Sequence, residues 1–338
     1  MADLQNLLNT IRLNASKEYQ TRVPEATRTN ITDVGNPIVS YASCQNEFLN
    51  NLVERIALTI VRNKIAKNPL SVLKKGTIPL GRDIQEIITN LTSAETFNEE
   101  GTELLKRNKA DVKAIYHRMN RQDQYTVTIS RQQLQTAFTS YSNLNYLLTS
   151  IVNTLYSSDN YDEFILMKNL FASAITGNKI KKIEIADITT NQTNAKSFIK
   201  AVKTCSSNMV YPSSNFNSYS KEGDLKPLIT WTPKENQLLI VRSDVMAEVD
   251  IEVLAVAFNM DKTTLLSRML EVDNFGSASD CYAILCDDSF VQVYDNLQEL
   301  TEFYNAKGLY HNYYWNHWQT YSLSTFANAV AFMKKSTQ

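Results

Sequence analysis

A long stretch of helical periodicity, from Gln132 to Thr176, most constrains what this chain can fold into. Apolar residues recur there three or four positions apart, a spacing that places them on one side of an α-helix. In the first half they are Leu134, Phe138, Tyr141, Leu144, Leu148, Ile151 and Leu155. Residues 157–160 (Ser-Ser-Asp-Asn) prefer caps and turns and predict an interruption. A second periodic run then ends at Gly177, where a helix C-terminus is expected.

The regions on either side of this helical spine have the patterns of strands. A helix of such length between strands predicts a large α+β protein in which a sheet packs against the spine. The 338 residues suffice for one large domain or two medium ones with a sizeable core.

The composition argues against several classes of protein. The 34 Lys and Arg residues nearly balance the 35 Asp and Glu residues. Tight nucleic-acid binding through a basic face is therefore not expected, although weak contact with a packaged polyanion is compatible with this balance. No apolar run has the length of a membrane span, and the N-terminus lacks a signal-peptide pattern. Four cysteines without Cys-x-x-Cys spacing are typical of reduced thiols in a cytosol.

The chain before the spine predicts helices, an arm and strands. Residues 4–13 have the period of a short helix, and a helical period returns at Phe48. Residues 14–42 are polar and aperiodic, which predicts disorder or an arm laid on another surface. The further predictions are a strand at 57–65, a turn-rich extended segment at 68–82, a short helix or strand at 83–90, and a hairpin formed by 112–119 and 124–130.

The chain after the spine predicts further strands and helices. The predicted strands are 180–185, 238–241, 281–285 and 290–294; the predicted helices are 194–203 and 251–258; and the predicted surface loop is 206–223. Farther on, Ala327, Ala329 and Ala331 form a face of small residues, and Phe326, Val330 and Phe332 form the opposite face. A row of alanines lets a helix approach a sheet closely, and the spine is the expected partner.

The segment from Leu309 to Tyr321 is unusually rich in aromatic residues. In a strand, one face would carry Tyr310, Tyr314 and Trp318, and the other Tyr313, Trp315 and Tyr321. Rings on both faces predict a strand that is covered on both sides, by its own domain or by a neighbouring subunit.

No group of residues predicts a catalytic, cofactor-binding or metal-binding site. His311 and His317 have no cysteine or acidic partner at ligand spacing, so packing in the aromatic strand explains them better than a metal. Helix capping explains the alternating acids Glu248, Asp250 and Glu252, and a solvent-facing turn explains Asp287 and Asp288. Cys281 and Cys286 have no histidine near them in sequence that could act as a base.

Four short segments resemble one protein family. They are Lys-Lys-Gly-x-Ile-Pro-Leu-Gly-Arg at Lys74–Arg82, Ala-Phe-Asn-Met at 257–260, Val-Tyr-Asp-Asn-Leu at 293–297 and Ser-x-Phe-Ala-Asn-Ala-Val-Ala-Phe at 324–332. In this order and spacing they resemble the major capsid proteins of small podophages of the phi-twenty-nine type. The similarity covers nearly the whole chain.

The resemblance implies the α+β major capsid fold of tailed phages and herpesviruses (Hong Kong ninety-seven type). It implies an N-terminal arm with short helices at 1–56, an extended loop with its strand legs at 57–130, and the spine helix of the peripheral domain at 131–179. An axial domain would follow at 180–293, and peripheral-domain strands at 294–338. Phi-twenty-nine-type relatives can continue into an immunoglobulin-like domain, and we expect a shell subunit without it.

The resemblance further implies a structural protein of the virion, not an enzyme, that self-assembles into an icosahedral or prolate shell around double-stranded DNA. Expected partners are other copies of the chain, a portal protein, a separate scaffolding protein, a head fibre or decoration protein, and the packaged DNA through weak contact, with no membrane. Assembly is expected in the bacterial host cytoplasm. The candidate inter-subunit contacts are Lys74, Lys75, Arg82, Tyr313, Trp315 and Trp318.

Two alternatives remain at this stage. One keeps the fold and makes the chain the shell of a cellular nanocompartment. The other treats the aromatic strand Tyr310–Tyr321 as a carbohydrate-binding platform, which requires exposed rings.

Overall fold

The computed structural model describes residues 4–59, 67–97, 99, 105–140, 143–144, 147, 150–151, 153–188, 192–219, 227–249 and 268–335. The chain divides into two compact units. Unit 1 comprises residues 1–68, 121–163 and 297–318, and unit 2 comprises residues 69–120, 164–296 and 319–338. Helix α7 (Ser158–Thr176) and strands β9 (Val291–Asn305) and β10 (Tyr310–Leu323) contribute residues to both units.

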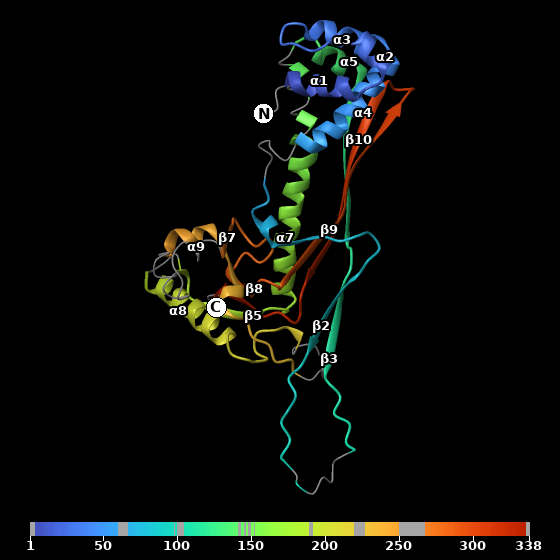
Figure 1. The fold of residues 1–338 in the computed structure, drawn as a ribbon. Helices are drawn as coiled ribbons and strands as arrows, with labels where there is room; N and C mark the ends of the chain where they lie inside the picture. Colours follow the sequence, from blue (N-terminus) through green and yellow to red (C-terminus); the bar gives the residue numbers. More distant parts are fainter. Residues whose placement is uncertain are drawn as a thin grey trace. The chain divides into compact units, whose positions relative to one another are not determined.

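Five helices of unit 1 share one hydrophobic core (Figure 1). They are α1 (Leu4–Asn14), α2 (Lys17–Arg22), α3 (Ile31–Ser40), α4 (Ala42–Thr59) and α5 (Arg131–Ala137). The predictions of helices at 4–13 and from Phe48 are confirmed. The prediction of an irregular segment at 14–42 is wrong, because α2 and α3 lie there with Tyr19 and Ile38 fully buried. Helix α2 is too short to show a period, and in α3 the glycine and proline at positions 35 and 37 obscure it.

The close packing of α3 against α5 explains a glycine inside a helix. Gly35 is buried, and a Cβ atom at this position would overlap the side chain of Phe138. Phe138 in turn packs edge-to-face on Phe48 of α4, with ring centroids 5.2 Å apart. Because position 35 has no side chain, α3 can pack closely against the end of α5 while Phe138 stays in contact with Phe48.

The helical spine is interrupted at a different place from the predicted one. Helix α5 ends at Ala137, and residues 138–140 form a turn. A π-helical turn, η3 (Asn153–Ser157), leads directly into α7, so the predicted break at 157–160 is wrong. The predicted end at Gly177 is confirmed. Asn178 adopts a left-handed φ of 55°, and the Lys179 N–H donates to the Ala174 carbonyl (2.8 Å), as in a Schellman motif.

A five-stranded sheet forms the centre of unit 2. Its strand order is β5 (Lys181–Ile185), β11 (Ala329–Lys334), β8 (Cys281–Asp287), β6 (Gln237–Arg242) and β7 (Met269–Val272). The alternation along β11 directs Ala329 and Ala331 into one core with Phe171 of α7. Val330 and Phe332 enter a second core with α8 (Gln192–Met209) and α9 (Ser243–Glu248). The predicted packing of the alanines against the spine is confirmed, because Ala327, Ala329 and Ala331 share this core with residues of α7.

The remaining strands form a four-stranded sheet and a separate pair. The sheet has the order β1 (Lys74–Thr77), β9, β10 and β4 (Arg121–Ser130), and the pair is β2 (Ile84–Thr89) with β3 (Val112–His117). The predicted hairpin of 112–119 with 124–130 is wrong, because β3 pairs with β2 and β4 pairs with β10. The short 3₁₀ helices are η2 (Pro69–Leu73) and η6 (Lys234–Asn236).

Several other predictions have clear outcomes. Residues 57–59 of the predicted strand 57–65 belong to α4, and its positions 60–65 lie outside the described residues, as does the predicted helix 251–258. The strands at 180–185, 238–241, 281–285 and 290–294 and the helix at 194–203 are confirmed. Within 206–223, residues 206–209 end α8, and Phe216 and Asn217 are buried, so the described part is not a simple surface loop. Among the described helices, none is long and apolar enough to cross a membrane.

Replacing Gly35 with alanine should destabilise unit 1. Alanine raises helix propensity, but the clash with Phe138 outweighs this gain, and we expect a net loss of about 1–3 kcal/mol in the free energy of unfolding. Urea denaturation of the soluble subunit measures the change. Asn36→Ala, at an exposed position of the same helix, is the control and should be neutral or slightly stabilising.

Candidate functional site

One face of the β2–β3 pair is uncharged, largely apolar and exposed. The antiparallel register pairs Gln85 with Tyr116, Ile87 with Ala114 and Thr89 with Val112. All six side chains point to the same uncovered face, and none of them carries a charge. Ile87 is 57% exposed and Tyr116 is 58% exposed. Native monomers seldom leave such a face open to water, so it has the character of a docking surface.

The opposite face of the pair is fixed to the body of unit 2. His117 is buried, and its ring nitrogens lie 2.7 Å from Ser322 Oγ and 3.0 Å from Glu86 Oε2. The second oxygen of Glu86 accepts a hydrogen bond from Ser324 Oγ (2.8 Å). These bonds fix the β2–β3 pair, called the β2–β3 hairpin below, to the end of β10 and the residues after it. The exposed face of the hairpin therefore has a defined orientation.

The chain beyond these two strands is open along its described length. Residues 90–97 and 105–111 run away from the sheets of unit 2 (Figure 1), and nearly all of their side chains are exposed. Phe97 is 85% exposed and Leu105 is 92% exposed. Within the part of the chain that the structure describes, little shields these two large apolar side chains from water.

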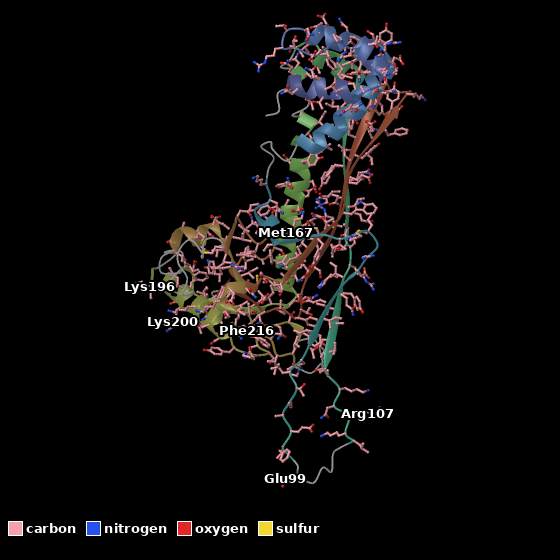
Figure 2. The ribbon with its side chains drawn as sticks, viewed as in Figure 1. Glu99, Arg107, Met167, Lys196, Lys200 and Phe216 are labelled. Atoms are coloured by element: carbon pink, nitrogen blue, oxygen red, sulfur yellow. The ribbon has the colours of Figure 1, made fainter. Side chains whose placement is uncertain are left out.

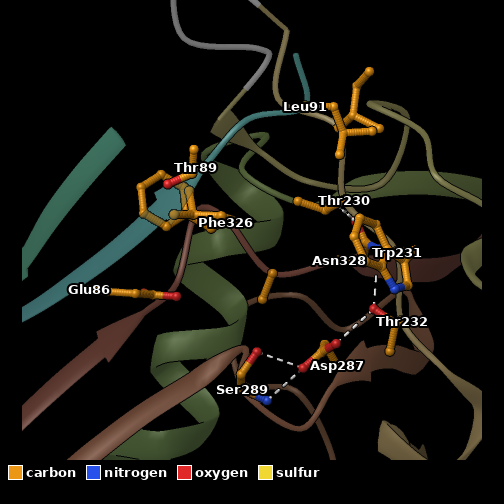
Figure 3. A pocket seen from close by; sticks show the side chains of 13 residues that line it. Glu86, Thr89, Leu91, Thr230, Trp231, Thr232, Asp287, Ser289, Phe326 and Asn328 are labelled. Atoms are coloured by element: carbon orange, nitrogen blue, oxygen red, sulfur yellow. Dashed lines mark hydrogen bonds between the residues drawn. The ribbon is translucent and has the colours of Figure 1, made fainter. Parts of the chain in front are cut away.

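A cavity of about 240 Å³ lies beside the base of the hairpin (Figure 3). Asp287 lines it, and its two carboxylate oxygens accept hydrogen bonds from Thr232 Oγ1 (2.7 Å) and from the N–H (2.9 Å) and hydroxyl of Ser289. Burial, followed by the neighbouring charge of Asp287, raises the pKa of Asp288. The Asp287–Asp288 pair therefore has a structural role in its turn, and Asp287 is not simply solvent-facing as predicted.

A buried charge cluster ties β4, α7 and β10 together within unit 1. Asp159 accepts hydrogen bonds from an Arg121 guanidinium nitrogen (2.9 Å), from Trp315 Nε1 (2.8 Å) and from His317 Nδ1 (2.7 Å). Burial alone would raise the pKa of Asp159, but the hydrogen bond and charge of His317, with Trp315 and Arg121, hold it below its usual value. The cluster cross-links three elements that are distant in sequence.

The structure gives the predicted contact residues different environments. Tyr313 and Trp315 are 2% and 9% exposed within the single chain, so little of either ring remains available to a neighbour. Lys74 forms an ion pair with Asp295 (2.8 Å). Lys75 and Arg82 are exposed, and Lys75 donates to the carbonyl of Asp288.

The aromatic strand has the predicted alternation. Tyr313, Trp315 and Tyr321 are buried, while Tyr310, Tyr314 and Trp318 are only partly covered. The subunit therefore covers one face of β10 fully and the other in part. The burial of Tyr313 and Trp315 removes two of the rings that a carbohydrate-binding platform would need.

The histidines and cysteines have structural environments. His317 lies between Asp159 and Gln298, and His311 packs on the ring of Tyr304 with centroids 4.6 Å apart. All four cysteines are buried and free. Burial raises the pKa of Cys281 to about 12 and also raises that of Cys286, which keeps both thiols protonated at neutral pH.

Sequence reasoning missed the exposed hairpin face and the buried charge cluster. Residues 84–88 (Ile-Gln-Glu-Ile-Ile) do not alternate between apolar and polar, so the sequence pattern did not reveal the two faces of this strand. Arg121 falls within the turn of the wrongly predicted hairpin, and Asp159 within the wrongly predicted break. Arg121 and Asp159 are partners that lie far apart in sequence, so the local pattern around each of them did not reveal their contact.

Comparison with known proteins gives a consistent result. The family model described as Phi29-like phage major capsid protein matches residues 8–333. The major capsid protein of Bacillus phage B103 is 36% identical over 330 residues, which cover 97% of this chain and 72% of that protein. The major capsid protein of Streptococcus phage Cp-1 is 27% identical, with 96% of this chain and 92% of that protein covered.

Solved structures show the same fold. The capsid structure of Staphylococcus phage Andhra matches with a TM-score of 0.67 at 12% identity and covers 81% of this chain and 86% of that one. A chain from the structure of the head fibre and inner core protein gp22 of bacteriophage P68 matches with a TM-score of 0.62 at 11% identity and the same coverage.

Asp159→Asn should strongly destabilise the subunit. The change removes the buried carboxylate that pairs with Arg121 and leaves it only the more exposed Asp123, and breaking a buried pair costs about 3–5 kcal/mol. Asp123→Asn is the matched control, since Asp123 pairs with the same Arg121 but its side chain is 43% exposed, and a loss below about 1 kcal/mol is expected. Equal losses in urea denaturation would contradict the assigned role of Asp159.

The contribution of Asp159 to the free energy of unfolding should disappear in acid. Its pKa is lowered in the folded state, so its stabilisation is fully present above the unfolded value of about 3.9 and is lost as the pH falls through the folded pKa. The difference in unfolding free energy between the wild type and Asp159→Asn should therefore shrink as the pH falls below about 4. A difference that persists unchanged in acid would show that the charge is not responsible.

Proposed function

Because this chain belongs to the Phi29-like phage major capsid protein family, we propose that its copies join into the phage head through the exposed face of the β2–β3 hairpin. The chain is a shell-forming capsid protein with the α+β capsid fold. The observation that carries the proposal is the uncharged apolar face around Ile87 and Tyr116, together with the exposed Phe97 and Leu105. A second subunit is the partner that would cover these side chains.

The energetics suit repeated assembly. Each partly exposed apolar side chain that becomes covered contributes on the order of 1 kcal/mol, so a single hairpin contact is modest. Modest contacts let misplaced subunits dissociate, while many simultaneous contacts make the closed shell stable. Head-to-tail contact between different surfaces closes into rings when the rotation permits, as a shell of fivefold and sixfold rings requires.

We further propose specific partners for the shell. The shell encloses double-stranded DNA and meets a portal protein, a separate scaffolding protein and a head fibre or decoration protein, after assembly in the host cytoplasm. Exposed Lys75 and Arg82 and the partly covered Trp318 are the contact residues that we retain from the sequence prediction. The near balance of 34 basic and 35 acidic residues supports a lining that holds DNA weakly enough to release it.

The subunit is a structural component, and we propose that it has no catalytic activity. The buried, protonated thiols of Cys281 and Cys286 and the fully engaged carboxylate of Asp287 support this view.

Ile87→Thr combined with Tyr116→Thr should impair assembly while leaving the subunit folded. Threonine keeps the β-branched shape that strands favour but removes most of the apolar surface. The loss of about 2 kcal/mol per contact should raise the subunit concentration needed for shells at least roughly tenfold. Gradient sedimentation and electron microscopy measure the shells, and circular dichroism verifies the fold.

The control is Ile87→Val combined with Tyr116→Phe, which keeps the apolar character and should assemble close to normally. Normal shells from the double threonine variant would overturn the assignment of the hairpin face. They would leave the shell-forming role itself intact.

A further inference from the structure

Helix α8 has one face that is entirely cationic or neutral and polar. Its exposed lysines Lys196, Lys200 and Lys203 follow one another at intervals of four and three residues, so they form a stripe along one side. The exposed neighbours are hydroxyl or amide side chains, namely Thr193, Ser197, Thr204 and Asn208. The opposite side, with Phe198 and Val202, is buried against the sheet.

The orientation of the stripe is therefore set by the core of unit 2. Figure 2 shows Lys196 and Lys200 at the edge of this unit, on the far side of α8 from the spine helix. Phe216 packs in the same core as the buried side of α8. A helix fixed in this way presents its lysines outward as a row about 10 Å long.

The stripe has no balancing acid on its own helix. None of the 18 residues of α8 is aspartate or glutamate. Like charges three and four positions apart destabilise a helix by about 0.2–0.5 kcal/mol per pair, whereas a glutamate in the stripe would stabilise it. A helix optimised only for stability would not keep three uncompensated lysines in a row, and an external polyanion would relieve their repulsion.

We propose that the stripe Lys196–Lys200–Lys203 binds backbone phosphates of the double-stranded DNA inside the shell. This inference rests on the proposed function, since it needs a shell that contains DNA. Double-stranded DNA carries one negative charge per about 1.7 Å of its axis, so a row about 10 Å long faces several phosphates at once. Flexible lysine side chains can follow these phosphates without a fixed register.

The chemistry of the face favours DNA over an acidic protein. The exposed side of α8 bears no apolar or aromatic side chain, and protein partners need such anchors for most of their binding energy. It also bears no arginine for bidentate base recognition, so the contact is independent of base sequence. Three phosphate contacts per subunit remain weak and reversible at physiological salt.

Lysine footprinting on wild-type particles tests the location of the stripe. DNA-filled and emptied particles are treated with a small amine-acetylating reagent, and mass spectrometry compares each lysine with the same residue in unfolded protein. We expect the three lysines to be several-fold less modified in filled particles than in emptied ones. Equal modification in both kinds of particle, whether high or low, overturns the proposal, because the stripe then faces the exterior or a subunit contact.

A charge-matched variant pair tests the interaction itself. Lys196, Lys200 and Lys203 are replaced by glutamine in the full-length soluble subunit, and binding to a short DNA duplex is measured by fluorescence anisotropy over a range of salt concentrations. The slope of log K against log salt should become shallower by about 2.7, since each phosphate contact accounts for about 0.9.

The control variant carries glutamine at Lys17, Lys307 and Lys335, which are exposed elsewhere and change the net charge equally. It should keep the wild-type slope. An equal change of slope in both variants would show that net charge alone governs binding, and would overturn the assignment of DNA binding to the stripe. An unchanged slope in the α8 variant together with lost binding of a scaffolding protein would overturn the DNA assignment in favour of a protein partner. Because shell formation is recorded separately, failure of the DNA contact remains distinct from failure of the shell-forming role.

Discussion

The two-sided burial of strand β11 is the constraint on which unit 2 depends. Its alternating residues must satisfy two cores at once, with alanines against α7 on one side and Val330 and Phe332 against α8 on the other. Alanine on the α7 side allows close approach of helix and sheet, and Phe332 on the α8 side meets Phe198 edge-to-face at 5.7 Å. Once this strand is placed, the outward faces of both helices are determined.

The hairpin shows the opposite use of apolar surface. A protein that had to remain monomeric would protect a two-stranded edge with charges or cover its apolar face. Here the anchoring groups, Glu86 and His117, lie on the attached face, while Ile87 and Tyr116 remain in water. The ionisable groups thus lie where they fix the β2–β3 hairpin to its own chain. The apolar groups lie where a neighbouring copy can cover them.

Much of unit 2 was predictable because its signals are local. The alternation in 180–185, the apolar run at 238–241 and the alanine row at 327–331 each reflect burial that a single strand records. Helix α2 was missed because it spans six residues and buries only Tyr19, and α3 was missed because Gly35 and Pro37 interrupt the period that Ile31, Val34 and Ile38 carry.

Strand pairing was the second failure, and its cause is topological. Residues 112–119 and 124–130 are adjacent in sequence with turn residues between them, which favours a hairpin. The structure instead uses Asn120 as a crossing point, where its side chain bonds both the N–H and the carbonyl of Tyr321. A short polar connection can therefore separate two sheets as well as join two strands, and only the long-range partner decides between them.

The charged residues of the two units differ in whether their partners lie inside or outside the chain. Arg121 and Asp159 are buried, so each needs the other within the chain, and Trp315 and His317 complete the set of hydrogen bonds. The lysines of α8 are exposed, so water can solvate each of them, but no acid on the helix offsets their mutual repulsion, which an external polyanion would relieve. A near-neutral chain can hence carry a locally cationic helix. In the proposed contact with DNA, weak binding by each helix suits a shell, because many copies together can order a polyanion that no single copy retains.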